Sequence, residues 1–239
     1  MFGKRRSFTF LPSISTHPHS IQMFAVIFDM DGVIADTNPT HDIAWRVFLE
    51  RYDVFATDND LRANMYGKHN SQILSYFLKR SLTQSEILDL QFEKEAIFRE
   101  IYRPIAEPVK GFLHFLNDLK RNGVKTGIAT SAPVENLDLI LEVFPLRDKM
   151  ESLLSERDVT RYKPEPDVYL QSAANLGVSP SQCVVFEDSI SGVQAGLNAG
   201  MKVVGVTTTY TPAELPPCSA YVPDYQNIDF TFVQRLLTT

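Results

Sequence analysis

The sequence predicts an α/β fold, in which a Rossmann-like parallel sheet is covered by helices on both faces and carries an inserted all-helical cap. Two observations lead to this fold class. Continuous apolar runs typical of buried strands alternate with amphipathic helical patterns along most of the chain, and residues 38–104 contain helical patterns alone. Because strands that alternate with helices through short connections form parallel sheets, we expect one sheet with helices packed against both faces.

Four apolar runs are the expected strands. FAVIF (24–28) is apolar throughout and runs directly into Asp29, as expected for a strand buried on both faces. Similar runs follow much later in the chain, as VKTGIAT (124–130), QCVVFE (182–187) and KVVGV (202–206). Together these strands would form the sheet of the core.

Helical patterns separate the later strands. In residues 109–119 the apolar side chains fall on one helix face, and the pattern stops at Asn122 and Gly123, a typical helix end. The other expected helices span residues 134–144, 167–176 (which ends at Gly177) and 189–199 (which ends at Gly200).

Residues 38–104 interrupt this alternation and form the expected cap. Helices are predicted at about 40–51, 59–66, 71–80 and 84–102, and Thr83 with Glu86 provides a capping box for the last of them. The chain would return near Pro104 to Pro108, which places the insert over the carboxyl edge of the sheet, where open α/β sheets bind ligands. We therefore predict a core of residues 23–37 and 105–239 and a helical cap of residues 38–104 that could act as a lid.

Composition and charge limit the class of protein. Of the 239 residues, 44% are hydrophobic, enough for a buried core. The net charge of −6 argues against a nucleic-acid partner, and no apolar stretch is long enough to span a membrane. Two cysteines, Cys183 and Cys218, cannot form a disulfide framework, and Cys183 lies in an apolar run where core packing is expected. We expect a cytoplasmic globular protein, and the sequence leaves its oligomeric state open.

Residues 1–22 differ in character from the rest of the chain. They contain three basic residues and no acidic one, with many Ser, Thr, Pro and His residues. The absence of a continuous apolar segment argues against a secretory signal. Two interpretations stay open: a weak organelle-transit sequence or, as we favour, a disordered or non-native tail that precedes a folded part starting at Met23.

Two pairs of acidic residues follow expected strands. Asp29 and Asp31 are two positions apart after the first strand, so in extended backbone both carboxylates would point to the same side, and Gly32 permits a sharp exit. Glu187 and Asp188 end another apolar strand, where two buried acids are costly unless their charge is neutralised. Paired carboxylates can hold a hard cation such as Mg²⁺, or divide into a nucleophile and an acid/base. Acidic pairs also occur in ordinary turns and helix caps.

A hydroxyl pair and a lysine complete the candidate set. Thr130 and Ser131 end the second strand just before a helix, where a hydroxyl and backbone N–H groups could bind an oxyanion. Lys163 lies between Tyr162 and two nearby prolines, and a lysine fixed there could act as a point charge on a phosphate. Taken singly, Ser131 could be a helix cap and Lys163 a solvated loop charge. All of these residues, however, would converge at one edge of one sheet.

The order of these motifs resembles the haloacid dehalogenase superfamily. DMDGV, TS after a strand, RYKPEPDVY and VVFEDSISGVQAGLNAGM are similar to its four motifs, and the similarity covers residues 24–210. The branch that contains β-phosphoglucomutase and small-molecule phosphatases is the most similar, with its cap at the position of the helical insert. The resemblance is specific for the superfamily and weakly specific for the substrate.

The resemblance implies a role for each motif residue. Asp29 would attack phosphorus and form an aspartyl-phosphate, while Asp31 would protonate the leaving oxygen and then activate the acceptor. Ser131 and Lys163 would hold the phosphoryl oxygens. Mg²⁺ would be bound by Asp29, the main-chain carbonyl of Asp31 and Asp188, with Glu187 as a direct or water-mediated ligand. Since dehalogenases of the superfamily lack an acid at the position of Asp31, dehalogenation is not favoured.

Two reactions therefore remain, which differ in whether water or a sugar hydroxyl accepts the phosphoryl group. Similarity to the mutases extends to Thr37, His41 and Lys94, where His41 could gate Asp31. After Ser131, however, this chain has Pro133, Val134 and Glu135 in place of the polar run with which the mutases grip a second phosphate. In the cap loop that would face the substrate, the mutase-type arginine has no clear equivalent, although Lys68, His69 and Asn70 could bind a sugar or a remote anion.

We therefore favour a Mg²⁺-dependent phosphatase that acts on a small phosphorylated metabolite such as a sugar phosphate. A β-phosphoglucomutase-type mutase is the alternative. A non-catalytic binding module on the same fold is a third hypothesis, because fold does not dictate function; the complete set of acidic motif residues argues against it.

Overall fold

The computed structural model describes residues 23–65 and 68–238, so the predicted tail of residues 1–22 lies outside the described residues. Within the described part, six parallel strands form one sheet in the order β3-β2-β1-β4-β5-β6. The strands are β1 (Ala25–Phe28), β2 (Lys125–Ala129), β3 (Ser152–Leu154), β4 (Cys183–Glu187), β5 (Lys202–Val206) and β6 (Ala220–Val222).

The four predicted strands are confirmed within two residues at each end. The sequence analysis missed β3 and β6, each of three residues, because runs so short carry no periodic signal. It also missed the C-terminal helix α9 (Phe230–Thr238). β1 lies between β2 and β4, and Phe28 is in register with Phe186 of β4, so the acidic residues that follow these two strands are neighbours.

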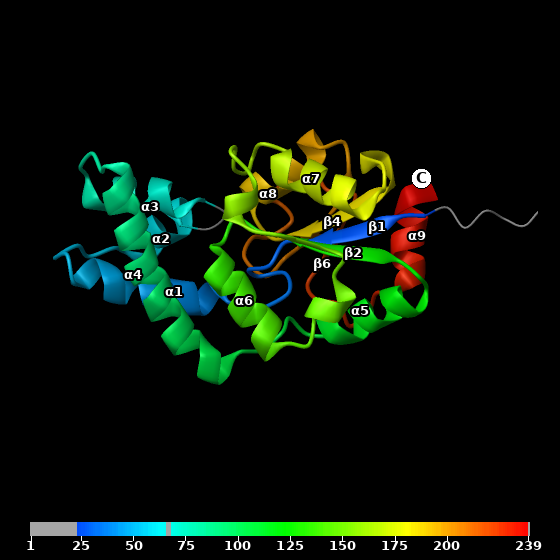
Figure 1. Cartoon of the computed structure of the whole chain (residues 1–239), viewed down its shortest axis with the longest axis horizontal. Coiled ribbons are helices and arrows are strands. Elements are labelled where there is room, and N and C mark those ends of the chain that lie inside the picture. Colours follow the sequence, from blue (N-terminus) through cyan, green and yellow to red (C-terminus); the bar gives the residue numbers. More distant parts are fainter. Residues whose placement is uncertain (1–22, 66–67, 239) are drawn as a thin grey trace, which may run out of the picture.

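Alternation along β1 explains why helices cover both faces. Val26 and Phe28 pack into one apolar cluster with α5 (Phe112–Arg121), α6 (Val134–Val143) and α9, whereas Ala25 and Ile27 pack into a second cluster with α7 (Asp167–Leu176) and α8 (Ile190–Asn198). Figure 1 shows these two helical layers on either side of the sheet. A strand buried on both faces reads as a continuous apolar run, which is why FAVIF was recognisable.

Aromatic packing fixes the ends of the two central strands. The rings of Phe28 and Phe186 lie 5.4 Å apart, and Phe115 and Tyr225 pack against both of them. Each such ring pair contributes on the order of 0.5–1.5 kcal/mol beyond its buried area. The residues that follow Phe28 and Phe186 are thus held on a rigid base.

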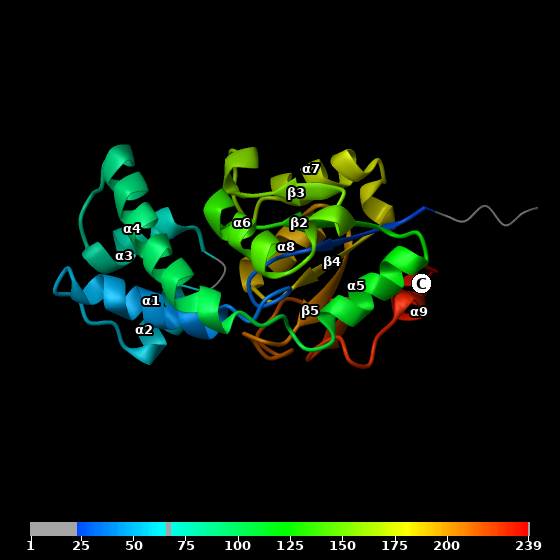
Figure 2. The ribbon, with the colours of Figure 1, turned by 60° about the horizontal axis from the view of Figure 1, so that its bottom comes forward.

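The insert forms the predicted helical cap. Its helices are α1 (Asn38–Glu50), α2 (Asp58–Asn64), α3 (Asn70–Leu78) and α4 (Gln84–Tyr102), each within two residues of its predicted bounds. Figure 2 shows them grouped at one end of the sheet. The capping box is confirmed, with Thr83 Oγ1 accepting from the backbone of Glu86 and Glu86 accepting from the backbone of Thr83.

The two connections between core and cap run side by side. Backbone hydrogen bonds join Asp36 to Glu107 (3.1 Å) and Val109 to Ile34 (2.9 Å). Ala35 also forms a backbone bridge with Pro108. The cap is therefore attached through one narrow double crossing, just beyond the residues that follow β1.

Candidate active site

A pocket between the sheet edge and the cap contains most of the predicted residues. From the core it is lined by the four motifs, namely Asp29 and Asp31, Thr130 and Ser131, Lys163, and Glu187 and Asp188. The cap supplies Asn38, His41, Trp45, Met65, Lys68, Asn70, Ile73, Lys94 and Glu95. The expectation that residues scattered over 160 positions converge is met because parallel strands end at the same edge.

Lys163 joins the first and last acidic motifs. Its Nζ donates to Asp29 Oδ1 (2.6 Å), Glu187 Oε1 (2.7 Å) and the carbonyl of Ala129 (3.1 Å). The ammonium also lies 4.8 Å from the centre of the Tyr169 ring. Burial acts to lower the pKa of Lys163, but Asp29 and Glu187 outweigh it and raise this pKa above its usual range. Lys163 is therefore a fixed cation.

Glu187 is fully buried and its carboxylate is saturated by protein donors. Oε1 accepts from Lys163 and from Tyr169 Oη (2.9 Å), while Oε2 accepts from the backbone and the hydroxyl of Ser189 (both 3.0 Å). Since each carboxylate oxygen has two lone pairs, all four are in use. A Cβ at Gly192 would lie 1.6 Å from Glu187 Oε1, so the absence of a side chain at Gly192 makes room for this carboxylate.

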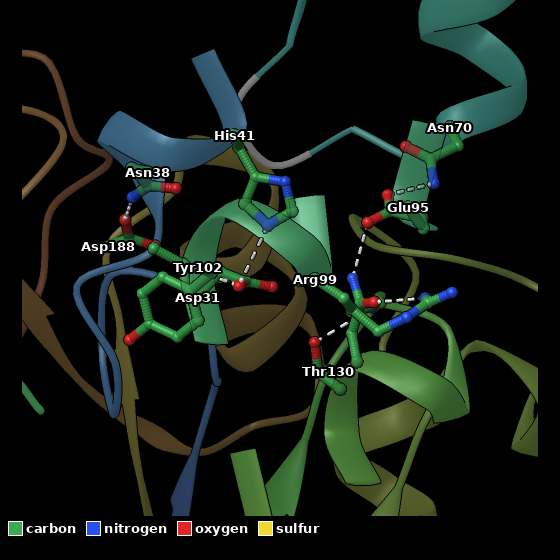
Figure 3. Close-up of polar contacts among 12 residues, drawn as sticks. Asp31, Asn38, His41, Asn70, Glu95, Arg99, Tyr102, Thr130 and Asp188 are labelled. Carbon is green, nitrogen blue, oxygen red and sulfur yellow. Dashed lines mark hydrogen bonds and ion pairs between the residues drawn. The ribbon is translucent and has the colours of Figure 1, made fainter. Parts of the chain in front are cut away.

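Asp188 lies on the other side of the site, where two polar side chains hold its carboxylate. Its Oδ2 accepts from Asn38 Nδ2 (2.9 Å) and from the Thr209 hydroxyl. Gly32 has a φ of +70°, and a Cβ there would lie 2.1 Å from Asp188 Oδ2, so the sharp exit predicted for Gly32 also makes room for Asp188. Figure 3 shows Asn38 facing Asp188. The sequence analysis missed Asn38 and Thr209; the threonine run that follows β5 is the polar strand-end signal that could have revealed Thr209.

Asp29, Glu187 and Asp188 form a buried acidic cluster whose ligand oxygens lie within 4.8 Å of one another. Burial raises the pKa of Asp29 to about 7, against the effect of Lys163, and Glu187 and Asp31 add to the increase. Burial, with Glu187 and Asp29, also raises the pKa of Asp188 well above its usual range. Three carboxylates face one lysine here, so the cluster could bind a metal ion that neutralises the excess negative charge.

The free oxygens of the cluster suit a hard cation. Among the described residues, no protein donor contacts Asp29 Oδ2 or Asp188 Oδ1, whereas both Glu187 oxygens are occupied. An all-oxygen set of this kind fits Mg²⁺, which keeps several water ligands and needs only one or two carboxylates from the protein.

Asp31 points away from this cluster, toward the cap. Its Oδ1 accepts from Thr37 Oγ1 (2.6 Å) and lies 3.3 Å from His41 Nε2. Both contacts use Oδ1, so among the described residues Oδ2 is left without a protein donor. Figure 3 shows His41 facing Asp31. Asp29 and Asp31 thus line one pocket but have different partners, a cation and a hydroxyl–imidazole pair respectively.

His41 is held from its other side by Lys94. Lys94 Nζ lies 2.8 Å from His41 Nδ1, and the Phe98 ring stacks on the imidazole at 3.8 Å. Because an ammonium can only donate, Nδ1 is the acceptor, which assigns the proton of a neutral imidazole to Nε2, facing Asp31. Burial lowers the pKa of Lys94, and the adjacent Glu95 opposes this effect. The structure therefore brings the predicted His41 and Lys94 together at Asp31.

The remaining predicted residues lie in different surroundings. Thr130 is buried and its Oγ1 accepts from the backbone of Ala132 (3.0 Å), whereas Ser131 is half-buried at the pocket wall. Lys68 also lines the pocket, but its Nζ donates to the Ala63 carbonyl (2.9 Å) and to Asn64 (3.3 Å).

Of the two residues after Lys68, one lies at the pocket and the other lies outside it. Asn70 donates to Glu95 Oε1 (2.7 Å) at the pocket. His69 lies outside this pocket: its Nε2 pairs with Glu156 (2.9 Å), its ring stacks on Tyr162 at 4.0 Å, and it lines a neighbouring cavity.

This fold and site define a class of protein: an α/β protein with an inserted helical cap and a buried aspartate directly after its first strand. The sequence profile of the haloacid dehalogenase-like hydrolase family matches residues 26–206, and the chain belongs to this family.

Two characterised relatives are 31% identical to the chain. One is β-phosphoglucomutase of Bacillus subtilis (strain 168), over 191 residues that cover 77% of this chain and 83% of that protein. The other is fructose-1-phosphate phosphatase of Escherichia coli (strain K12), over 185 residues that cover 76% and 95%. The crystal structure of β-phosphoglucomutase from Clostridium difficile is 25% identical, with a TM-score of 0.81, and covers 90% of this chain and 97% of that one.

The chain is therefore an enzyme of the sugar phosphatase or phosphomutase type. Both cysteines are free, and Cys183 is buried in β4 as predicted. Within the described residues, no helix is long and apolar enough to cross a membrane.

Proposed function

We propose that the protein is a Mg²⁺-dependent phosphatase that hydrolyses a small phosphomonoester, such as a sugar phosphate, through an aspartyl-phosphate intermediate on Asp29. The observation that carries this proposal is the pocket itself, which unites a buried carboxylate, a fixed lysine and a second, separately held carboxylate. In-line phosphoryl transfer requires such a set: a nucleophile, neutralising charge and a proton donor for the leaving oxygen.

Asp29 Oδ2 and Asp188 Oδ1 are the oxygens that would bind Mg²⁺ directly, together with the main-chain carbonyl of Asp31. All four lone pairs of Glu187 are taken by protein donors, so either role expected for it, direct or water-mediated, would require Glu187 to give up one of these donors. When bound, Mg²⁺ supplies positive charge to the phosphoryl oxygens and reduces their repulsion of a carboxylate nucleophile.

The chain's own residues account for both halves of the reaction. An Asp29 oxygen forms a bond to phosphorus while the bond from phosphorus to the leaving oxygen breaks, and Asp31 gives that oxygen a proton. Asp31 then takes a proton from water as the water oxygen attacks phosphorus and the bond from phosphorus to Asp29 breaks, which releases inorganic phosphate, restores the Asp29 carboxylate and returns Asp31 to its protonated form. Lys163 and Ser131 hold the phosphoryl oxygens, and Thr37 and His41 orient Asp31.

The residues after Ser131 favour water as the phosphoryl acceptor. Pro133 and Val134 provide no cation for a second phosphate, and the Glu135 carboxylate is paired with Arg157 (2.6 Å). Lys94, a cation that lines the pocket, is already neutralised by Glu95 (2.9 Å). Lys68 is then the pocket cation that remains for the distal group of a bisphosphate intermediate, and its Nζ is already bound to the Ala63 carbonyl and to Asn64.

One observation favours the mutase alternative. Thr37, His41 and Lys94, the residues through which the sequence resembles the mutases, are assembled at Asp31. A mutase would convert β-glucose 1-phosphate in a reaction that requires a catalytic bisphosphate. Release of phosphate without any such conversion would reject this alternative.

The proposal is tested by measuring phosphate release from a panel of sugar phosphates, with Mg²⁺ and with EDTA. Asp29→Asn is expected to abolish turnover while leaving the circular dichroism spectrum unchanged, because the amide keeps the shape and loses the nucleophile. Asp36→Asn, an equivalent change at an exposed position seven residues later, serves as the control and should retain wild-type turnover. Undiminished turnover by Asp29→Asn would refute the proposed mechanism.

A further inference from the structure

A further buried carboxylate, Glu95, lines the active-site pocket from the cap and lies outside the roles described so far. Its Oε1 accepts from Asn70 (2.7 Å) and Lys94 (2.9 Å), and its Oε2 accepts from Asn136 (2.6 Å). Only 3% of its surface is exposed. Burial acts to raise the pKa of Glu95, but Lys94, His41 and Asn136 outweigh it and lower this pKa to about 2. Glu95 is thus a buried charge that depends on its three donors.

Asn136 is the only one of these three donors that belongs to the core. It lies in α6, five residues after Ser131, and is fully buried. Its amide is used at both ends: Nδ2 donates to Glu95, and Oδ1 accepts from Arg99 Nη1 (2.9 Å). Glu95 and Arg99 are four residues apart in α4 and therefore lie on one helix face. One core side chain is thus held between two cap side chains.

Lys94 receives its position from the same carboxylate. Its Nζ is bound by Glu95 Oε1 and His41 Nδ1 and lies 4.9 Å from the centre of the Trp45 ring. Among the described residues, Glu95 is the carboxylate that pairs with Lys94. A continuous series of contacts therefore runs from Asn136 in the core, through Glu95 and Lys94 in the cap, to His41 and back to Asp31 in the core.

We propose that Glu95 is a positioning residue: by binding Asn136 and Lys94 at once, it aligns His41 on Asp31 only while the cap is docked on the core. If the cap moves off the core, Asn136 is withdrawn and Glu95 loses one of three donors. Glu95 then keeps only its cap donors, Asn70 and Lys94, so the Glu95–Lys94 pair is no longer anchored to the core, and His41 no longer presents Nε2–H to Asp31. The proton-transfer group of the enzyme is thereby aligned only when the pocket is closed. This inference rests on the proposed function, since it concerns the proton that Asp31 gives to the leaving oxygen.

The leaving group of the substrate separates positioning of Asp31 from general support of the fold. An alkyl phosphate, such as a sugar phosphate, needs a proton on its leaving oxygen, whereas p-nitrophenyl phosphate releases a stable phenolate that needs none. The ratio kcat/KM reports the steps up to phosphorylation of Asp29, where the leaving group departs. Misaligned Asp31 should therefore slow the alkyl phosphate selectively, while a damaged fold should slow both substrates.

We would measure kcat/KM for both substrates with wild type, Glu95→Gln and Asn136→Ala. Glu95→Gln keeps the size of the side chain, and Asn136→Ala removes only the core donor. Both variants are expected to lose on the order of 10- to 100-fold in kcat/KM with the alkyl phosphate and less than about threefold with p-nitrophenyl phosphate. Arg103→Ala is the matched control, because it removes an exposed ion pair between the cap and Glu142 of α6 (2.6 Å) that does not involve Lys94. This variant should leave kcat/KM unchanged with both substrates.

Equal losses on the two substrates, or no loss on either, would overturn the positioning role of Glu95. A wild-type enzyme that hydrolyses neither phosphate would instead overturn the proposed function, and with it this inference. If Glu95→Gln does not fold, the substrate selectivity of Asn136→Ala decides the question, because that variant leaves Glu95 paired with Lys94.

Discussion

The acidic cluster should make the metal-free enzyme less stable as the pH rises. Burial, with Glu187 and Asp31, raises the pKa of Asp29 from 3.8 to about 7 in the folded protein. A folded-state pKa above the unfolded value means that the folded state binds the proton more tightly. The stability that this carboxyl contributes is therefore fully present below pH 3.8 and is lost as the pH rises through about 7.

The size of the effect follows from the same two pKa values. A difference of one pKa unit corresponds to about 1.4 kcal/mol, so ionising Asp29 in the folded state costs about 4 kcal/mol between these limits. For a chain of 239 residues, 1 kcal/mol shifts the melting temperature by roughly 2–4 °C, so the expected shift is on the order of 10 °C.

The assay is thermal unfolding of wild type and Asp29→Asn in EDTA at pH 5, 6, 7 and 8. Asparagine occupies the same space and does not titrate, so the difference between the two proteins isolates Asp29 from the other titrating groups. The variant should become progressively more stable than wild type toward pH 8, and adding Mg²⁺ at pH 8 should stabilise wild type far more than the variant. A constant difference between the two proteins from pH 5 to 8 would refute the electrostatic reasoning.

Two other substitutions test close contacts at the site. Gly192→Ala would place a Cβ 1.6 Å from Glu187 Oε1, so we expect a loss of about 1–3 kcal/mol in the free energy of unfolding and a large drop in turnover. Gln194→Ala, exposed on the same helix, is the control in denaturant titration, and wild-type stability of Gly192→Ala would contradict the packing argument. Glu156→Ala removes the core acceptor of His69 (2.9 Å) and Gln91 (2.7 Å), two cap residues. We expect faster hydrogen exchange in α3 and a several-fold higher KM, relative to Arg157→Ala, whose partner Glu135 lies in the core; unchanged exchange would show that these bonds do not hold the cap.

The main elements of the fold are predictable from local patterns. The apolar run 24–28 and the runs related to it identify the four longer strands, because a strand buried on both faces has no polar alternation to obscure it. Thr83 and Glu86 mark the start of α4 because a capping box involves only residues three apart. β3 and β6 are missed because pairing with an already formed sheet, and not their own three residues, makes them strands.

The positions of the motif residues in the fold are predictable for a related reason. Asp29 and Asp188 each follow a strand directly, and Ser131 lies two residues after the end of another; parallel strands bring their carboxyl ends to one edge regardless of sequence separation. To predict that these residues meet, it is therefore enough to know that parallel strands end at one edge of the sheet. The partners of these residues obey no such rule: nothing local indicates that Asn38 and Thr209, 171 residues apart, bind the same carboxylate.

By itself, then, the sequence determines the α/β class, the cap, the family and the residues at the strand ends, because each is encoded in short segments. Only the tertiary structure decides how charge and protons are arranged around them. It shows that Glu187 is saturated, that Asp31 faces the cap, and that Glu95 is bound across the interface by Asn136, 41 positions later. These contacts depend on how the cap docks on the core, and docking is set by the fit of two surfaces that no single segment of the chain describes.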